Sequence, residues 1–376
     1  MSELVLYRKH RPKDFDEVIG QEHLVEAIRN SLKMGRIAHA YLFSGPRGVG
    51  KTTIARLIAK ALNCTAPTSA EVSAGKKERP CNSCASCASF NESRAMNVIE
   101  IDAASNRGID EIRELREGVR YIPSEGNYKT YIIDEVHMLT KEAFNALLKT
   151  LEEPPAHAVF VLATTEIEKV PATIISRTQH YDFRRPQIAQ IAERLQRVVK
   201  KEHATLAPDA AHLIALAAEG SPRDAESILG QIMAVEDKNI TRDEVENILG
   251  LPRREAGKQM FGHIAAHDQR AAIALVQELN DAGYDLNYFS KLLMRYFRAA
   301  LFLKTDPQLK QFVENEMLRD EVECIVANLN SFTREDLSKG IATIFQNMQQ
   351  FKKMPIPQLP LELTIVEIIS ALPAQV

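Results

Sequence analysis

The chain has 376 residues, which is more than one ordinary hydrophobic core can organise, so we expect two or three domains. Hydrophobic residues make up 45% and charged residues 26% of the sequence, a composition typical of soluble globular proteins. The formal net charge of −3 excludes a uniformly basic nucleic-acid-binding protein, so any contact with nucleic acid must be local. No apolar run is long enough to span a membrane and the start has no signal-peptide core, so we expect a cytoplasmic protein with no membrane partner.

A basic stretch precedes the first predicted helix. Arg11 and Pro12 indicate an extended lead-in. Apolar residues at helical spacing then predict a helix over residues 21–32. Taken alone, this segment is an amphipathic surface helix preceded by basic residues.

The next segment joins a predicted strand to a predicted helix through a glycine-rich turn. Residues 41–44 are an apolar run of strand type, residues 45–53 read GPRGVGKTT, and residues 54–62 have helical spacing. This order matches the strand, G-x-x-x-x-G-K-[ST], helix arrangement of a phosphate-binding loop, and the flanking elements disfavour a chance match in an ordinary turn. The glycines let successive backbone N–H groups converge on phosphate oxygens, beside the positive end of the helix. We expect Lys51 to reach the β- and γ-phosphates and Thr52 to bind Mg²⁺.

Four of the five cysteines cluster after this helix. They are Cys64, Cys81, Cys84 and Cys87, and an aperiodic segment at 65–80, predicted to be an exposed loop, lies between the first two. Three of these thiols lie at two-residue intervals and Cys64 ends the preceding helix, so together they supply four soft ligands that suit a tetrahedral, structural Zn²⁺ site. An iron–sulfur cluster and reduced free thiols are the alternatives. The fifth cysteine, Cys324, lies in an apolar helical pattern and is expected to be a packed thiol.

Two further predicted strands lead into polar residues. Residues 97–102 precede small and polar residues at 105–109, which either cap the next helix or bind a phosphate, including one of a nucleic-acid backbone. Residues 131–133 precede Asp134 and Glu135. Many strands end in acids, but downstream of a phosphate loop these two are expected beside Mg²⁺ and beside the water that attacks the γ-phosphorus.

A strand at 158–163 is expected to bring Thr164 and Thr165 to the carboxyl edge of the sheet, where one hydroxyl could hold the attacking water or the γ-phosphate. Arg177 follows an apolar helical turn and, taken alone, is a surface arginine. Strands alternate with helices up to about residue 180, which predicts a doubly wound parallel α/β domain.

From residue 186 onward the pattern becomes helical, and the segment 241–376 is predicted to be helical throughout. Ser221 and Pro222 are expected to be an N-cap and a first helical residue, which places Arg223 in the first turn of a helix. A cation in that turn opposes the helix dipole unless it meets an anion, so Arg223 is a candidate phosphate contact.

Together these motifs resemble one family. They are, in order, Val18-Ile19-Gly20-Gln21, the phosphate loop, Cys64 with Cys81, Cys84 and Cys87, Asp134-Glu135-Val136-His137-Met138-Leu139, Leu148-Lys149-Thr150-Leu151-Glu152-Glu153-Pro154-Pro155, Ala163-Thr164-Thr165, Ser176-Arg177 and Gly220-Ser221-Pro222-Arg223-Asp224-Ala225. The set closely resembles the tau/gamma family of bacterial DNA polymerase III, the clamp-loader AAA+ ATPases. The cysteine insertion is the feature that separates this family from other AAA+ ATPases.

The resemblance implies a fold and a domain order. An AAA+ P-loop NTPase domain with a parallel sheet is expected at 1–180, with a zinc-binding insertion at about 64–90. A small helical lid domain at 181–242 and an all-α C-terminal collar for oligomerisation at 243–376 would follow. The resemblance also implies that the helicase- and polymerase-binding domains of a tau form are absent from this sequence.

It further implies roles for individual residues. Lys51, Asp134 and Glu135 would act as described above, Thr165 would be a first sensor, and Arg223 a second sensor on the γ-phosphate of its own subunit. Arg177 would be a finger inserted into the site of a neighbouring subunit. The nucleotide-binding residues implied are Tyr7, Arg11, Val18, Ile19, Gly45, Gly48, Val49, Gly50, Lys51, Thr52, Thr53 and Arg223. Thr52 and Asp134 would hold Mg²⁺, the four clustered cysteines would hold Zn²⁺, and Ser105 to Ile109 would face duplex DNA.

The function implied is that of an ATPase motor with ATP, Mg²⁺ and Zn²⁺ as cofactors and without a polymerase site of its own. It would work with other clamp-loader subunits and with copies of itself in a ring, opening the sliding clamp and loading it onto primer–template DNA. Two alternatives are another AAA+ machine, such as a branch-migration helicase, and a zinc-stapled scaffold that does not hydrolyse ATP. The intact Lys51, Thr52, Asp134 and Glu135 disfavour the scaffold.

Overall fold

The computed structural model describes residues 5–66, 79–92, 94–123, 126–235, 239–252, 254–314, 317–351 and 353–372. Most of the loop predicted at 65–80 lies outside these residues. The chain divides into two compact units, Met1–Thr241 and Arg242–Val376. Each unit is described by itself.

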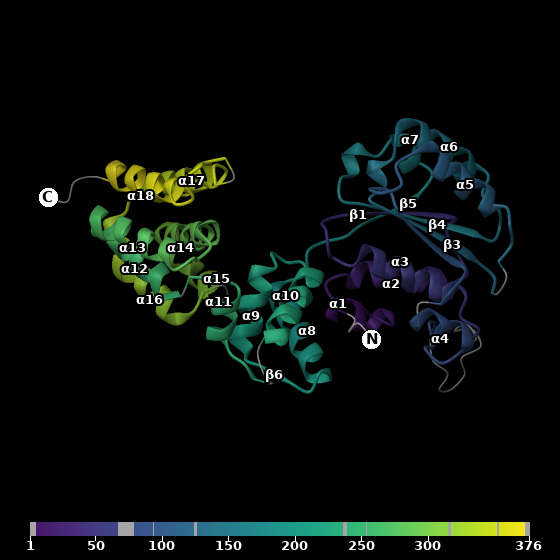
Figure 1. The fold of residues 1–376 in the computed structure, drawn as a ribbon, viewed down its shortest axis with the longest axis horizontal. Helices are drawn as coiled ribbons and strands as arrows, with labels where there is room; N and C mark the ends of the chain where they lie inside the picture. Colours follow the sequence, from purple (N-terminus) through teal and green to yellow (C-terminus); the bar gives the residue numbers. More distant parts are fainter. Residues whose placement is uncertain are drawn as a thin grey trace. The chain divides into compact units, whose positions relative to one another are not determined.

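The first unit contains a five-stranded parallel sheet in the order β2-β3-β4-β1-β5 (Figure 1). The strands are β1 (Ala40–Ser44), β2 (Val98–Asp102), β3 (Lys129–Asp134), β4 (Ala158–Thr164) and β5 (Gln179–Asp182). All residues of β1 and β4 are buried, because helices cover both faces of the sheet. The predicted doubly wound parallel α/β fold is confirmed, although the edge strand β5 was not predicted, since its exposed positions give no continuous apolar run.

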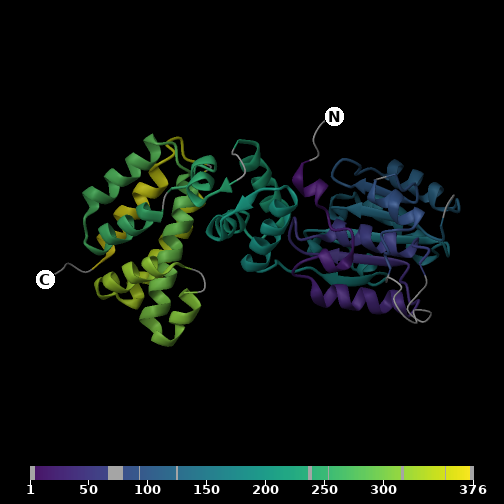
Figure 2. The same cartoon turned by 90° about the horizontal axis from the view of Figure 1, so that it is seen from below.

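Two layers of helices enclose this sheet. They are α2 (Glu22–Lys33) and α3 (Lys51–Leu62) on one face, and α5 (Ile109–Val119), α6 (Lys141–Glu152) and α7 (Ala172–Ile175) on the other (Figures 1 and 2). One apolar cluster joins α2 and α3 to the sheet through residues such as Ile28, Ile54 and Phe43. A second cluster joins α5 and α6 to the opposite face through residues such as Ile112 and Leu147. The two cores hold the carboxyl edge of the strands in a fixed position.

A helical part follows the sheet within the same unit. It consists of α8 (Ile188–Lys201), α9 (Pro208–Ala217) and α10 (Pro222–Val235), together with the short parallel strands β6 (Thr205–Leu206) and β7 (Asn239–Ile240). The predicted cap is confirmed, because the Ser221 hydroxyl accepts a hydrogen bond from the Asp224 N–H at 3.3 Å. Two elements were not predicted, namely the two-residue strands and the short helix α1 (Leu6–Lys9), which packs against α10. They are too short to show a period in the sequence.

In the second unit, the described residues form helices, as predicted. The α-helices are α11 (Arg242–Ile248), α12 (Arg254–Ala265), α13 (Gln269–Asp281), α14 (Leu286–Thr305), α15 (Lys310–Glu314), α16 (Arg319–Asn328), α17 (Arg334–Met348) and α18 (Leu359–Ala371). Their core contains an aromatic cluster of Phe261, Tyr296, Phe297 and Phe332. Cys324 is half-buried in α16, with its sulfur 3.8 Å from the Lys258 carbonyl oxygen, so the prediction of a packed thiol holds. Within the described ranges, no helix has both the length and the apolar character needed to span a membrane.

Candidate nucleotide and metal sites

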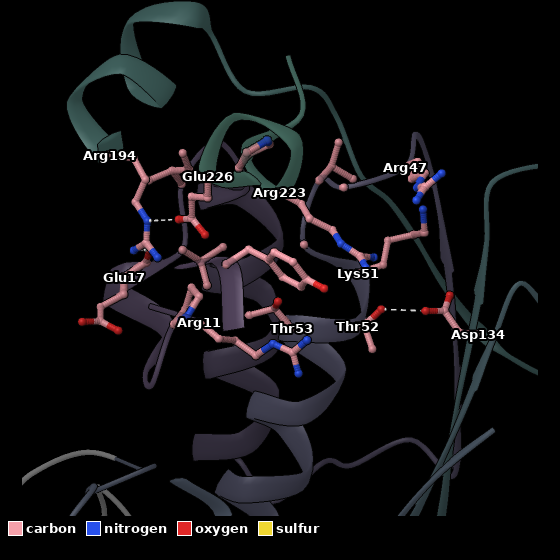
Figure 3. Close-up of a pocket in the computed structure, with 18 of the residues that line it drawn as sticks. Arg11, Glu17, Arg47, Lys51, Thr52, Thr53, Asp134, Arg194, Arg223 and Glu226 are labelled. Carbon is pink, nitrogen blue, oxygen red and sulfur yellow. Dashed lines mark hydrogen bonds and ion pairs between the residues drawn. The ribbon is translucent and has the colours of Figure 1, made fainter. Parts of the chain in front are cut away.

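The residues that follow β1 and those at the end of β3 line a pocket, together with the N-terminal segment before α2 and with α8 and α10 (Figure 3). The lining residues are Tyr7, Arg11, Pro12, Glu17, Val18, Ile19, Arg47, Gly48, Val49, Gly50, Lys51, Thr52, Thr53, Asp134, Glu135, Arg194, Pro222, Arg223 and Glu226. The pocket thus brings together eleven of the residues proposed from the sequence to bind nucleotide, whereas the twelfth, Gly45, begins the loop and is not a lining residue. Pro12, Glu17, Arg47, Arg194, Pro222 and Glu226 line it as well and were not predicted.

The phosphate-binding loop has the backbone conformation expected of its glycines. Gly45, Gly48 and Gly50 have φ angles of 136°, 77° and 104°, in the region that residues with a Cβ rarely adopt. Gly48 also makes a close approach, since a Cβ atom there would lie 2.0 Å from the Ser221 hydroxyl oxygen. The loop therefore lies directly against the N-terminus of α10.

Lys51 is the first residue of α3, and its side chain is buried at the base of the loop. Its ammonium donates hydrogen bonds to the carbonyl oxygens of Gly45 at 2.6 Å and Pro46 at 2.8 Å. Burial lowers the pKa of Lys51, and the carboxylates of Glu135 and Asp134 oppose this effect. A cation kept at the positive end of a helix favours an anionic ligand at this position.

Thr52 and Asp134 are in direct contact across the sheet edge. The Thr52 hydroxyl donates a hydrogen bond to Asp134 Oδ2 at 2.9 Å (Figure 3). One hydroxyl and one carboxylate in this arrangement are oxygen donors that suit Mg²⁺, which prefers few protein ligands and the oxygens of a phosphate. The residues present therefore fit the predicted magnesium site.

Glu135 follows Asp134 in a left-handed backbone conformation with φ of 48°, which is uncommon for a residue with a side chain. Such a turn costs of order 1 to 3 kcal/mol and is typical of functional sites. Its carboxylate accepts a hydrogen bond from the Thr165 hydroxyl at 2.9 Å, and the buried His137 ring lies 3.5 Å from the same oxygen. Thr165 itself does not line the pocket and reaches it through Glu135.

His137 was part of the recognised sequence pattern but was assigned no role. Its Nδ1 lies 3.0 Å from the Thr164 hydroxyl, and its Nε2 lies 3.2 Å from Glu166 Oε1. Its position, two residues after Glu135, is the only feature of the sequence that could have suggested a role for His137 in the site. These contacts fix the ring behind the carboxylate of Glu135.

The side of the pocket formed by α10 carries Arg223. Its guanidinium lies over the Tyr7 ring, 4.9 Å from the centroid, and a hydrogen bond from Arg223 lowers the pKa of the Tyr7 phenol. Arg223 is thus in the first turn of its helix, as predicted, and faces the pocket that also contains Lys51 (Figure 3).

A buried ion pair lines the same pocket. Arg194 Nε, on α8, donates to Glu226 Oε1, on α10, at 2.9 Å (Figure 3). Burial raises the pKa of Glu226, and the guanidinium of Arg194 opposes this shift. Glu226 follows Arg223 by three residues and shares its helix face, which was the signal available in the sequence. No feature of the sequence pointed to Arg194, because its hydrogen-bond partners are far away in the chain.

Two predicted site regions lie outside the pocket. Arg177 is half-exposed and forms an ion pair with Glu152 at 2.7 Å, and its Nη1 donates to the Thr173 carbonyl oxygen at 2.9 Å. Residues 105–109 lead into α5, and the Ser105 hydroxyl donates to Asp102 Oδ2 at 3.0 Å. Neither region is part of the pocket in its own chain.

The four clustered cysteines converge on one point. Their sulfur atoms all lie within 4.8 Å of one another, and the Cys81–Cys87 and Cys84–Cys64 sulfur pairs are 4.0 Å apart. Four sulfurs around one zinc at 2.3 Å would be about 3.8 Å apart, so the set fits a single tetrahedral ion. These sulfur–sulfur distances are too short for the four cysteines to enclose the several iron and sulfide atoms of an iron–sulfur cluster. The hydrogen bond between Cys64 and Cys87 lowers the pKa of the Cys64 thiol and raises the pKa of the Cys87 thiol, so Cys64 is the sulfur that most readily becomes a thiolate ligand.

The segment that carries the four clustered cysteines, called the cysteine knuckle below, is connected to α3 by Lys60. The side chain is buried, and its ammonium donates to the Lys13 carbonyl oxygen at 2.8 Å, to Asn91 Oδ1 at 2.6 Å and to Asn82. Burial lowers the pKa of Lys60. In the described part of the knuckle, the apolar core consists of the cysteines and Ala66, so these polar contacts and the predicted metal would hold it in place.

The fold and the pocket define a class of protein. A parallel sheet of this strand order, a phosphate loop after β1, acids after β3 and a helical part that places an arginine in the pocket are the features of an AAA+ P-loop protein.

The comparisons identify the family. Successive segments match family models described as "DNA polymerase III, delta subunit" at residues 20–187, "DNA polymerase III clamp loader subunit, ATPase lid domain" at 190–237 and "DNA polymerase III subunits gamma and tau domain III" at 240–375. DNA polymerase III subunit tau of Bacillus subtilis is 40% identical over 98% of this chain and 63% of its own length. Subunit gamma of Buchnera aphidicola is 37% identical over 88% of this chain and 89% of its own. The chain belongs to the gamma and tau family of DNA polymerase III subunits.

The match to longer relatives is partial. The alignment covers 43% of subunit tau of Escherichia coli, at 44% identity over 76% of this chain. The chain thus spans less than two thirds of the tau relatives in these alignments. Among solved structures, the RuvB Holliday junction branch migration motor of Thermotoga maritima aligns with 68% of this chain and 78% of its own, at 20% identity and a TM-score of 0.48. A likeness of this size supports no conclusion about function.

Proposed function

We propose that the chain is the ATPase motor subunit of a DNA polymerase III clamp loader, which uses ATP binding and hydrolysis to open a sliding clamp and load it onto primer–template DNA. The observation that carries the proposal is the composition of one pocket. It combines the phosphate loop with Lys51, the Thr52–Asp134 contact, Glu135 and, from α10, Arg223. Family membership and the match to the clamp-loader lid model support the same conclusion.

Each group has a distinct task in this proposal. The N–H groups of the loop and the ammonium of Lys51 bind the β- and γ-phosphates, which are anions at the positive end of α3. Thr52 and Asp134 would hold Mg²⁺, which neutralises charge on the phosphate oxygens when bound. Glu135 accepts a proton from the attacking water, and the Thr165 hydroxyl, 2.9 Å from Glu135 Oε2, orients that carboxylate.

Arg177 is proposed to act in the pocket of a neighbouring subunit. It lies outside the pocket of its own chain and is half-exposed, and its ion-pair partner among the described residues is the exposed Glu152, so little free energy is lost when it changes partners. An arginine finger stabilises the charge that develops on the transferred phosphoryl group. Hydrolysis would therefore depend on assembly into a ring with copies of this chain and with other clamp-loader subunits.

ATP would act by stabilising one arrangement of the ring more than another. Gly48 in the phosphate loop is in contact with Ser221 at the start of α10, and Arg223 follows two residues later. A nucleotide bound at the loop would therefore fix the position of α10. ATP binding would favour an open spiral that grips the clamp and DNA, and hydrolysis would release both.

The other predicted features fit this role as proposals. The cysteine knuckle would hold one structural Zn²⁺, and residues 105–109 would face DNA. The domain assignment stays as proposed from the sequence: nucleotide-binding domain at 1–180, lid at 181–242 and collar at 243–376. The protein would work in the cytoplasm, where replication takes place.

The test is the steady-state ATPase rate of the chain with the other clamp-loader subunits, with and without clamp and primed DNA. We expect clamp and primed DNA to raise the rate. An ATPase that ignores the clamp but separates DNA strands would contradict the proposal and indicate a helicase. No hydrolysis in any combination would indicate a scaffold.

A further inference from the structure

The buried pair Arg194–Glu226 lies at the end of the pocket away from Lys51 and Thr52 (Figure 3). The Arg194 and Glu226 side chains are 8% and 7% exposed. Lys51 and Thr52 mark the phosphate end, so a bound nucleoside triphosphate would direct its base toward the opposite end. Val18 and Ile19, which line the pocket as well, supply apolar surface for a base.

Arg194 holds Glu226 in one orientation. Its Nε donates to Glu226 Oε1 at 2.9 Å, its Nη1 donates to the Glu17 carbonyl oxygen at 3.5 Å, and its Nη2 donates to the His10 carbonyl oxygen. With all three nitrogens engaged, the guanidinium cannot turn to serve the second carboxylate oxygen. Among the residues that the structure describes, no donor reaches Glu226 Oε2, and this oxygen points toward the pocket (Figure 3).

This second oxygen is accessible from the pocket. Among the described residues, the fully buried side-chain polar atoms without a hydrogen-bond partner are Thr130 Oγ1 and Tyr131 Oη, and Glu226 Oε2 is not one of them. Glu226 therefore presents a charged acceptor, held in place by Arg194, to a ligand that enters this end of the pocket.

Glu17 lines the pocket on the same side (Figure 3), but both of its carboxylate oxygens already have donors, the Lys13 N–H at 2.7 Å and the Lys201 ammonium at 3.4 Å. Val18 and Ile19, which also line the pocket, have no polar side-chain atoms to meet the edge of a base.

We infer that Glu226 determines which purine the pocket accepts, by taking a hydrogen bond at Oε2 from the amino group at C6 of adenine. The inference rests on the proposed function, in which the pocket binds ATP. Adenine presents a donor at this position, whereas guanine and hypoxanthine present a carbonyl oxygen. A fixed carboxylate attracts the amino group of adenine and repels the carbonyl oxygen of guanine or hypoxanthine. The pocket would therefore select adenine both by a favourable contact with it and by an unfavourable contact with the other two bases.

The substitution Glu226→Gln should reverse this preference. Arg194 Nε requires an acceptor, so the amide places its oxygen toward Arg194 and its NH₂ group toward the base. ATP then meets a donor where it needs an acceptor, and ITP, which carries the C6 carbonyl, gains a partner. By calorimetric titration of the full chain we expect the ratio of ATP to ITP affinity to fall about tenfold or more.

Glu193→Gln is the matched control. It removes the same charge from the same part of the fold, but at an exposed position of α8 that does not line the nucleotide pocket. Its ratio of ATP to ITP affinity should equal that of the wild-type chain. Thermal unfolding of each variant checks that it is folded.

The outcomes separate the possibilities. An equal loss of ATP and ITP affinity in Glu226→Gln, or an unchanged ratio, would overturn the inference while ATP binding by the wild-type chain still supported the proposed function. If Glu226→Gln does not fold, Glu226→Asp keeps the charge and withdraws the carboxylate by one methylene, so ATP affinity should fall while ITP stays weak. An unchanged ATP affinity in Glu226→Asp would also overturn the inference. A wild-type chain that binds neither nucleotide would contradict the proposed function itself.

Discussion

Replacing Lys51 by Met should abolish most of the ATP affinity without weakening the nucleotide-free fold. The Lys51 ammonium is buried, and it donates to the carbonyl oxygens of Gly45 and Pro46. Burial lowers the pKa of Lys51, so the charged form costs free energy unless an anion is present. Met keeps an unbranched side chain of similar volume in the same space, so we expect unchanged or slightly higher stability without ATP.

The expected magnitude follows from linkage. Hydrogen bonds from a charged group to phosphate contribute roughly 1.5 to 3 kcal/mol, so the dissociation constant for ATP should rise roughly 10- to 100-fold. With ATP at about 100 times the wild-type dissociation constant, binding stabilises the wild-type chain by about 2.7 kcal/mol and a 100-fold weaker variant by about 0.4 kcal/mol. For a unit of this size, the ATP-induced rise in Tm should fall from about 5–10 °C to about 1 °C.

Thermal unfolding with and without ATP and Mg²⁺ measures both effects, and Lys60→Met is the matched control. Lys60 is a second buried lysine of α3, but its ammonium contacts the cysteine knuckle and does not line the pocket. Lys60→Met should keep the full ATP-induced rise. It should lower the Tm without nucleotide, because the Lys13 carbonyl oxygen and the side chains of Asn82 and Asn91, which Lys60 joins to α3, lose their common donor. The account of Lys51 is refuted if Lys51→Met keeps that rise, or if it loses stability in the absence of ATP as Lys60→Met does.

Four further substitutions are expected to have separable effects. Arg177→Ala should keep ATP binding and lower assembly-stimulated hydrolysis by about 10³-fold, measured as ATPase rate in the assembled complex. Glu135→Gln should keep ATP binding and lower hydrolysis by about 10²-fold or more in the same assay. Cys84→Ser should lose the zinc, about one ion per chain, that elemental analysis of the wild-type chain should find. Gly340→Ala should lower the unfolding free energy of the helical unit by roughly 1 to 3 kcal/mol in denaturant, because its Cβ would lie 2.5 Å from the Phe297 ring.

Each expectation has a contrary result. Failure of the isolated Arg177→Ala chain to bind ATP would place this arginine in the pocket of its own subunit. Full hydrolysis by Glu135→Gln would remove Glu135 from the reaction. Iron, or no metal, in the wild-type chain would exclude the zinc site. Lost ATP affinity in Gly340→Ala, with unchanged unfolding, would contradict the assignment of this glycine to the core of α14 and α17.

The parts of the site that local patterns encode could be predicted from the sequence. The phosphate loop is contiguous, and its glycines, Lys51 and Thr52 lie within a few residues of one another. Asp134 was predictable because the carboxyl ends of parallel strands meet at one edge, and the structure places it 2.9 Å from Thr52. Burial on both faces gave the central strands β1 and β4 continuous apolar runs that are easily recognised.

Long-range and very short features could not be predicted. Arg194 donates to the carbonyl oxygens of His10 and Glu17, more than 170 residues away in the sequence, and backbone acceptors leave no trace in residue types. Glu135 has a left-handed backbone conformation that a side chain ordinarily disfavours, and its carboxylate contacts Thr165, which is 30 residues away in the sequence. The two-residue strands β6 and β7 are shorter than any period that a pattern could show.

The central claim is that the triphosphate pocket of one subunit is completed by an arginine of the next, and mixing two inactive variants tests it most directly. A Lys51→Met chain lacks the phosphate-binding lysine but keeps its finger, whereas an Arg177→Ala chain keeps its pocket but lacks the finger. We expect each variant alone, assembled with the other clamp-loader subunits, to be nearly inactive, and the mixture to regain ATPase activity. A mixture no more active than its two components, or a monomeric wild-type chain that hydrolyses ATP at the full rate, would contradict the claim.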